Sequence, residues 1–164
     1  MGINCQEFLE LVVQPTLKQL GETSPVADKL MLATACYQSE MGHHLKGSNG
    51  IGIFGINEEL HQEVWDKHIA FDCDLASAIR GMASQHEFPK QPHVELATNL
   101  RYATAIAWMV YQYRDLTLPE SDCPIGLAQC WQESFINRPI GFEERDAFIK
   151  CFNKGNPGSN KLAA

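Results

Sequence analysis

One long apolar segment constrains the fold of this chain more than any other feature. Ser24-Pro25 has the pattern of a helix N-cap followed by proline at the first helical position. At about 100° per residue, the apolar side chains that follow surround the helix axis, namely Leu30, Met31, Leu32, Ala33, Cys36 and Tyr37. A helix that is apolar on all sides is buried. We therefore predict that residues 25–45 form a central helix, surrounded by about five or more others.

Hydrophobic periodicity and capping residues predict the other helices. Pro15 is expected to kink or split the first of them. Asn57 is expected to cap one helix, and either Asp72 or Asp74 another. The predicted segments are residues 8–20, 57–68, 72–82, 94–114, 122–135 and 142–152.

A glycine-rich segment follows the central helix. Residues 47–56 contain four glycines that alternate with apolar residues, a pattern that favours a tight loop or a short β-hairpin over a helix. The predicted fold is thus one mainly α domain over residues 1–154, with strand content below about a tenth. The polar, glycine-containing tail at 155–164 is expected to be flexible or bound to a partner.

Charge and composition exclude several classes of function. The 164 residues carry a net charge of −7, which argues against binding nucleic acid by phosphate neutralisation. The chain has no polybasic cluster that would favour an anionic membrane, and its N-terminus does not resemble a secretory signal. We expect neither a nucleic-acid partner nor a membrane partner.

The six cysteines are expected to be reduced, buried thiols, because the chain is neither small nor preceded by an export signal. No CxxC pair and no Cys/His spacing typical of zinc is present. We predict no metal site and no cofactor.

Residues 33–57 resemble a small phage-encoded lysozyme-like family with the fold of soluble lytic transglycosylases and goose-type lysozymes. The family's helix reads A-A-x-E-S-x-x-G-H, and residues 35–43 read ACYQSEMGH. Its glycine-rich stretch reads G-x-G-x-x-Q-hydrophobic, and residues 50–56 read GIGIFGI. Further similarity follows in the same order through residues 59–69, 97–107 and 130–149, which include Asn99, Tyr102, Ala103, Trp131, Phe135, Asn137 and Gly141. The resemblance implies a lysozyme-like single domain with a groove for a sugar chain.

The chain departs from the family at two positions of the implied active site. Gln38 aligns with the catalytic Glu, and Gly55 aligns with the loop Gln. Glycosidic cleavage needs a proton for the leaving oxygen, usually from a carboxylic acid, and a carboxamide cannot supply it. The resemblance implies substrate-binding roles for Gln38, Ser39, Gly52, Phe54, Gly55 and Tyr102.

Glu40 is the candidate for a replacement catalytic acid. It follows Gln38 by two residues, which is about 200° around a regular helix, so only a shifted alignment or a distorted helix end would bring it to the groove. Glu58 and Glu59 are interpreted as helix-dipole charges, and Glu63 and Asp66 as exposed helix charges. The alternative interpretation of Gln38 is a satisfied polar residue within a helix bundle, and the tyrosines are better explained as packing than as sugar platforms.

Three functions fit this sequence. The first is a structural protein of a phage virion, made in the bacterial host cytoplasm, as a neck, tail or internal core component. Its partners would be other virion proteins, with a homo-oligomer as one arrangement. The second is an active peptidoglycan hydrolase or transglycosylase that uses Glu40. The third is a module that binds peptidoglycan glycan without turnover.

Overall fold

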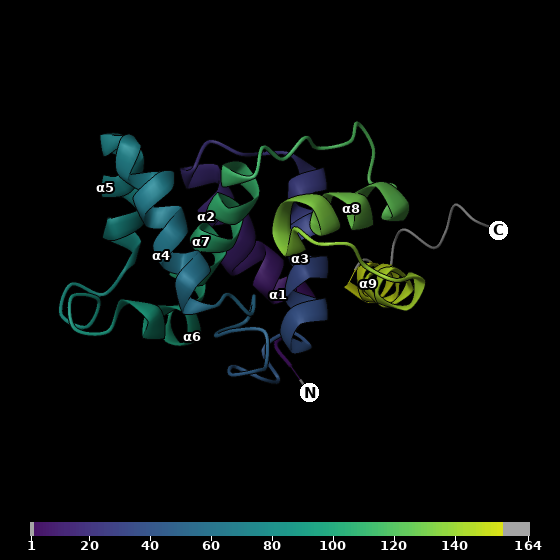
Figure 1. Cartoon of the computed structure of the whole chain (residues 1–164), viewed down its shortest axis with the longest axis horizontal. Coiled ribbons are helices and arrows are strands. Elements are labelled where there is room, and N and C mark those ends of the chain that lie inside the picture. Colours follow the sequence, from purple (N-terminus) through teal and green to yellow (C-terminus); the bar gives the residue numbers. More distant parts are fainter. Residues whose placement is uncertain (1, 156–164) are drawn as a thin grey trace.

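Helices account for most of the computed structural model, which describes residues 2–155. Figure 1 shows α4, α5 and α6 on one side, α3, α8 and α9 on the other, and α7 with the N-terminal helices between them. The α-helices are α1 (Cys5–Phe8), α2 (Gln14–Gln19), α3 (Pro25–Ser39), α4 (Glu58–Lys67), α5 (Cys73–Met82), α6 (Glu95–Thr98), α7 (Leu100–Tyr113), α8 (Pro124–Cys130) and α9 (Phe142–Gly155). Shorter turns are the π-helices η1 (Leu9–Val13) and η4 (Trp131–Ile136) and the 3₁₀-helices η2 (Ile69–Phe71) and η3 (Pro92–Val94). No strand forms within residues 2–155, and the predicted mainly α class is confirmed.

The predicted N-caps form as the sequence indicates. The Ser24 hydroxyl accepts a hydrogen bond from the Val26 amide at 3.2 Å. Asn57 Oδ1 accepts from the Leu60 amide at 2.8 Å, and Asp72 Oδ1 accepts from the Asp74 and Leu75 amides at 3.0 Å each. Each side chain satisfies amide groups that the first helical turn leaves without a partner.

The predicted helix over 25–45 ends early, at Ser39. Glu40 (φ 52°), Met41 (φ 59°) and Gly42 (φ 80°) all have left-handed backbone conformations. The Glu40 and Met41 amides turn back onto the Cys36 and Ala35 carbonyls, which closes the helix in the manner of an αL cap. The apolar pattern did not reveal this end, because it is made by backbone hydrogen bonds.

Two buried helices share the core, and this corrects the prediction of a single central one. Most residues of α3 are buried, as the apolar pattern predicts, and α3 packs chiefly on α9. Helix α7 packs against α2, α3, α4, α5, α6, η1 and η4. A buried hydrogen bond of 2.7 Å between the Thr34 and Tyr111 hydroxyls joins α3 to α7.

The predicted helix over 94–114 is broken at Asn99, whose extended backbone (φ −125°, ψ 98°) separates α6 from α7. Asn99 Oδ1 accepts from the Tyr102 amide at 3.0 Å. Its Nδ2 donates to Glu95 Oε2 and to the Met82 carbonyl, at 2.9 and 2.8 Å. The asparagine therefore acts as an N-cap inside an apolar run.

The N-terminal segment is divided into α1, η1 and α2 without an intervening loop. Pro15 has no amide proton for the carbonyl four residues before it. The widened π-helical turn over Leu9–Val13 lies where that hydrogen bond is missing. The predicted kink or split at Pro15 thus takes the form of a change of helix type.

All six cysteines are free thiols, as predicted. The prediction that all of them are buried is wrong. Cys36 is buried, at 6% exposure, whereas Cys73 and Cys123 are exposed. The Cys151 thiol of α9 hydrogen-bonds to Cys36, which lowers the pKa of Cys36 to about 7 and raises the pKa of Cys151.

The glycine-rich segment forms a loop without paired strands. Two isolated antiparallel bridges, Lys46 with Ile51 and Ile51 with Ile56, are its only β-type contacts among the residues described. At the other end of the chain, α9 continues through Gly155, one residue beyond the expected domain boundary. The rest of the predicted tail, 156–164, lies outside the described residues. None of the helices in 2–155 is long and apolar enough to span a membrane.

Candidate functional site

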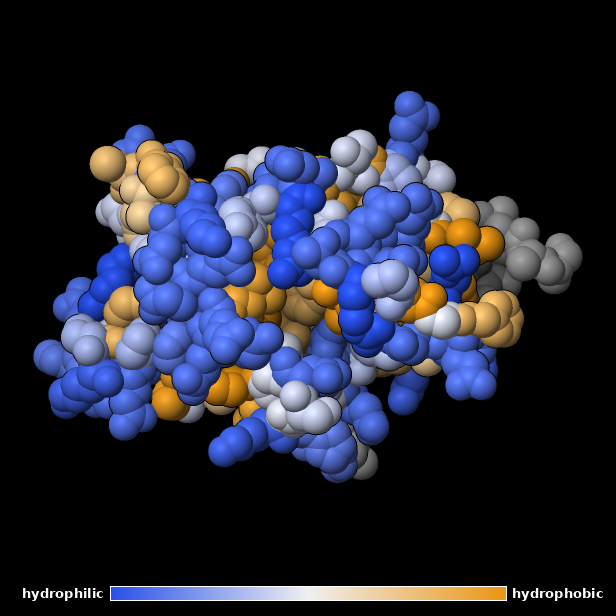
Figure 2. Space-filling view, viewed as in Figure 1, coloured by the Kyte–Doolittle hydropathy of each residue, from blue (hydrophilic) through white to orange (hydrophobic). Residues whose placement is uncertain are grey.

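A groove lies where the C-terminal end of α3 meets the glycine-rich loop. Its main part is a cavity of about 450 Å³. A smaller hollow of about 280 Å³ shares Gln38, Ser48, Asn49 and Gly55 with it and continues along the loop. Figure 2 shows this face as a hollow between hydrophilic surfaces, with apolar side chains at its bottom. We refer to these two hollows together as the groove.

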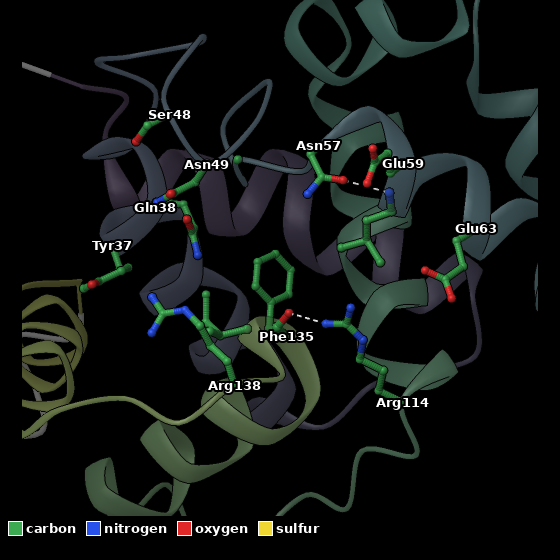
Figure 3. A pocket seen from close by; sticks show the side chains of 13 residues that line it. Tyr37, Gln38, Ser48, Asn49, Asn57, Glu59, Glu63, Arg114, Phe135 and Arg138 are labelled. Carbon is green, nitrogen blue, oxygen red and sulfur yellow. Dashed lines mark hydrogen bonds between the residues drawn. The ribbon is translucent and has the colours of Figure 1, made fainter.

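Figure 3 shows how side chains from separate parts of the chain border the groove. Gln38 and Asn49 are drawn at one end and Glu63 and Arg114 at the other, with Phe135 between them. The main cavity is lined by Tyr37, Gln38, Ser48, Asn49, Gly55, Asn57, Glu59, Leu60, Glu63, Arg114, Phe135, Ile136 and Arg138.

Ser39 fixes the loop against α3. It is 2% exposed, and its hydroxyl donates to the Ile53 carbonyl at 2.6 Å while it accepts from the Gly42 amide at 2.8 Å. One side chain thereby connects the helix end, the turn after it and the loop. Ser39 acts as a positioning residue, since its hydroxyl proton is donated to the Ile53 carbonyl and the residue does not line the groove.

Gln38 is the polar group of α3 that faces the groove. Its Oε1 atom is buried and has no hydrogen-bond partner among residues 2–155. Gly55 lies against it, so that a Cβ atom placed on Gly55 would be 3.2 Å from Gln38 Oε1. A buried carbonyl oxygen without a donor is costly. Because Gly55 covers this oxygen, the part of the amide that a bound molecule can reach is Nε2, which Figure 3 shows pointing toward the groove.

The far wall carries a carboxylate and a guanidinium. Glu63 Oε1 accepts from the Tyr113 hydroxyl at 2.9 Å and from Lys67 Nζ at 3.1 Å, which lowers the Glu63 pKa. Glu63 is therefore held as a carboxylate and suits hydrogen-bond acceptance rather than proton donation. The Arg114 guanidinium donates to the Phe135 carbonyl at the end of η4, and burial lowers its pKa.

Arg138 closes the groove beside Gln38 and Tyr37. Its guanidinium binds the Glu144 carboxylate through two hydrogen bonds of 3.2 and 2.9 Å. A fork-to-fork pair of this kind holds the planar group in one orientation. Burial also raises the pKa of Tyr37, so its hydroxyl stays protonated at neutral pH.

Glu40, the predicted catalytic acid, does not line the groove. It is the left-handed cap residue of α3, and its side chain is exposed. Its negative charge acts against ionisation of the Cys36 and Cys151 thiols, although the hydrogen bond from Cys151 still leaves the pKa of Cys36 lowered. The distorted helix end considered from the sequence does occur, and it leaves Glu40 toward the α9 side.

The structure unites three of the six predicted substrate-binding residues and gives the others structural roles. Gln38, Gly52 and Gly55 border the groove. Ser39 positions the loop, as described above. Phe54 is buried against Phe8, with ring centroids 6.2 Å apart. Tyr102 is buried between His61 and Trp65, outside the groove.

Four further groove residues were not predicted from the sequence, namely Asn49, Glu63, Arg114 and Arg138. Glu59 and Glu63 are spaced to share one helix face, but Glu59 was interpreted as a helix-dipole charge and Glu63 as an exposed helix charge. The two arginines come from segments far from α3 along the chain, and no local pattern could reveal their approach.

The groove is suited to binding a neutral, hydroxyl-rich chain. It offers amide groups, a carboxylate held ionised and apolar contact surface from Phe135 and Ile136. Among residues 2–155, no group of three or more His, Cys, Asp and Glu side chains is placed to hold a metal ion. The groove thus contains hydrogen-bonding groups at both ends and no carboxyl group on α3.

Comparisons with protein-family models, with curated proteins and with solved structures gave no match for this chain.

Proposed function

We propose that this chain is a lysozyme-like domain that binds a glycan strand of peptidoglycan and does not cleave it. The carrying observation is Gln38: a carboxamide lies at the head of the groove, with its oxygen buried and its nitrogen toward the groove, at the position that aligns with the family's catalytic Glu. An amide there can bind a sugar hydroxyl or N-acetyl group but cannot act as the general acid.

The rest of the groove supports binding rather than chemistry. The acidic residues that line it, Glu59 and Glu63, come from α4 on the opposite wall. The low pKa of Glu63 is the reverse of what a catalytic acid needs at neutral pH. Glu40, the acid of the alternative enzymatic function, lies on the other side of the α3 end.

We further propose that the domain serves as a structural component of a phage virion, as the resemblance to phage-encoded sequences implies. Its partners would be other virion proteins or further copies of this chain. Mass spectrometry of purified particles of a phage that encodes the chain tests this location. Absence of its peptides from the particles would contradict it.

Co-sedimentation with purified peptidoglycan sacculi tests the proposed binding. We expect the chain to sediment with the sacculi and to release no soluble glycan fragments from them. Asn49→Trp should reduce retention about tenfold or more, because the exposed Asn49 side chain borders both parts of the groove.

Gln85→Trp is the matched control, since Gln85 is an exposed loop residue outside the groove. Equal retention of Asn49→Trp and the wild type would place the binding surface elsewhere. Release of soluble glycan fragments by the wild type that disappears in Glu40→Gln would overturn the non-catalytic proposal and establish Glu40 as the acid.

A further inference from the structure

A second cavity lies on the other side of α4, away from the groove. It encloses about 540 Å³ between α4, α5 and the segment that leads into η3. Helix α4 presents Glu59 and Glu63 to the groove, whereas His61, Gln62 and Trp65 line this second cavity. We call it the α4–α5 cavity; the remaining lining residues are Asp66, Ala76, Ser77, Arg80, Phe88, Pro92 and His93.

Aromatic rings make the walls of the α4–α5 cavity. The Trp65 and Phe88 ring centroids are 6.0 Å apart with an interplanar angle of 53°. The Trp65 indole N–H donates to the Tyr102 hydroxyl at 2.8 Å, which fixes the ring. A fixed apolar surface of this kind is suited to contact with a planar apolar ring.

A buried hydrogen-bond chain determines which proton His93 presents. Tyr102 Oη lies 2.7 Å from His61 Nε2, and His61 Nδ1 lies 2.8 Å from His93 Nδ1. Burial lowers the pKa of His61 to about 4, so at neutral pH its ring carries one proton.

Only one direction of this chain satisfies every group. If Tyr102 donates to His61 Nε2, then His61 Nδ1–H donates to His93 Nδ1, and His93 keeps its proton on Nε2. In the reverse direction, Tyr102 Oη accepts from both Trp65 and His61, and its own proton has no acceptor among the described residues. Because a buried orphan donor is costly, His93 Nε2–H is a donor on a residue that lines the cavity.

Arg80 is a second donor at the same cavity, whose lining also includes the Asp66 carboxylate. Its guanidinium carbon lies 4.5 Å from the centroid of the Phe88 ring. It makes one long hydrogen bond, 3.4 Å to the Ser84 carbonyl, and no ion pair with any residue of 2–155. The nearby Asp66 carboxylate is instead bound by Gln62 Nε2 at 3.0 Å on both oxygens.

We propose that the α4–α5 cavity is a binding site for a small aromatic carboxylate. The ring of such a ligand would pack on Trp65, Phe88 and Pro92, and its carboxylate would accept from Arg80 and His93. Apolar walls with two convergent donors are the usual composition of a small-ligand site. This site is separate from the groove, and it stands independently of the proposed glycan function.

Titration of the ¹⁵N-labelled chain with benzoate, benzamide and acetate tests the site. The reporter is the Trp65 indole N–H resonance, identified by its loss in Trp65→Phe. We expect benzoate to shift it saturably with a dissociation constant of about 1 mM, in the range open to so small a probe. Neutral benzamide and ringless acetate should bind at least about tenfold more weakly, because each lacks one of the two required features.

Arg80→Gln should weaken benzoate binding about tenfold, whereas Arg101→Gln, which changes an exposed arginine of α7 bound to Gln19, should leave it unchanged. If Arg80→Gln fails to fold, Ala76→Phe, which fills the cavity from α5, should abolish the shift. No saturable shift, equal binding of benzoate and benzamide, or an unchanged affinity in the folded Arg80→Gln or Ala76→Phe variant would overturn the proposal.

Discussion

Gln38 determines what the groove can do chemically. Burial of its Oε1 atom means that a carboxyl group in the same place would lose solvation, and this raises the pKa of a carboxylic acid. Gln38→Glu would therefore introduce a group that retains its proton near neutral pH. This is the property that a general acid needs.

We predict that Gln38→Glu gains slow cleavage of peptidoglycan. General acid catalysis contributes a factor of about 10² to 10⁴, and release of soluble glycan fragments from sacculi measures it. Gln85→Glu, in an exposed loop, controls for the added charge. Wild-type cleavage at the rate of Gln38→Glu would contradict the role assigned to the amide.

A glutamine at position 55, in place of Gly55, should destabilise the chain. Gly55 has φ +60°, and a side chain other than Asn or Asp in this region costs about 1–2 kcal/mol. The new Cβ atom would also press on Gln38 Oε1. Urea unfolding should show a larger decrease in the free energy of unfolding for Gly55→Gln than for Gly55→Asn, since Asn tolerates the left-handed region. Equal decreases would refute the conformational explanation.

His61 should make stability depend on pH. Its folded-state pKa of about 4 lies below the ordinary value of 6.5, so the unfolded chain takes up the proton first as pH falls. Stability is then lost between pH 6.5 and 4, by up to about 3 kcal/mol. Urea unfolding at pH 7 and pH 4.5 measures this loss, which should shrink in His61→Gln and persist in the exposed-site control His86→Gln. The same pH dependence in His61→Gln would assign it to another group.

At the scale of elements, the groove depends on how the glycine-rich loop is attached to the helices. Ser39 holds the loop to α3 on one side. On the other side, Gly52 (φ +81°) packs so closely that a Cβ atom would lie 1.8 Å from the Leu96 carbonyl oxygen of α6. The loop therefore joins α3 to the α6 region.

Gly52→Ala should destabilise the chain by about 2 kcal/mol or more, because it combines a disfavoured φ with a backbone clash. Thermal or urea unfolding measures this effect. Gly47→Ala is the control, since a Cβ atom at Gly47 would meet nothing within 4 Å, and it should change stability by less than about 0.5 kcal/mol. A similar cost at both positions would show that the close approach to α6 is not the cause.

The sequence predicts elements well where their signals are local. The N-caps at Ser24, Asn57 and Asp72 are local, and all three form. The break at Asn99 was missed because a hydrogen bond to the Met82 carbonyl of another helix contributes to it. The end of α3 was missed because backbone hydrogen bonds and the Ser39–Ile53 contact form it. Helix α7 was not predicted to be the helix that contacts most of the others, because those contacts join segments far apart in the sequence.

At the scale of the molecule, the groove is assembled from α3, the loop, α4 and the segments around Arg114 and Arg138. The sequence could point to Gln38 and the loop, which are neighbours along the chain. It could not reveal a wall contributed from nearly a hundred residues further on. Such a wall follows from packing around α7 and α8–η4.

Native mass spectrometry of the chain with a purified peptidoglycan oligosaccharide tests the central claim most directly, because one spectrum reports both binding and the length of the bound sugar. We predict a complex with the intact oligosaccharide, which is recovered at full length after prolonged incubation. Shortened oligosaccharides would show that the groove cleaves its ligand, and the absence of any complex would show that it does not bind glycan.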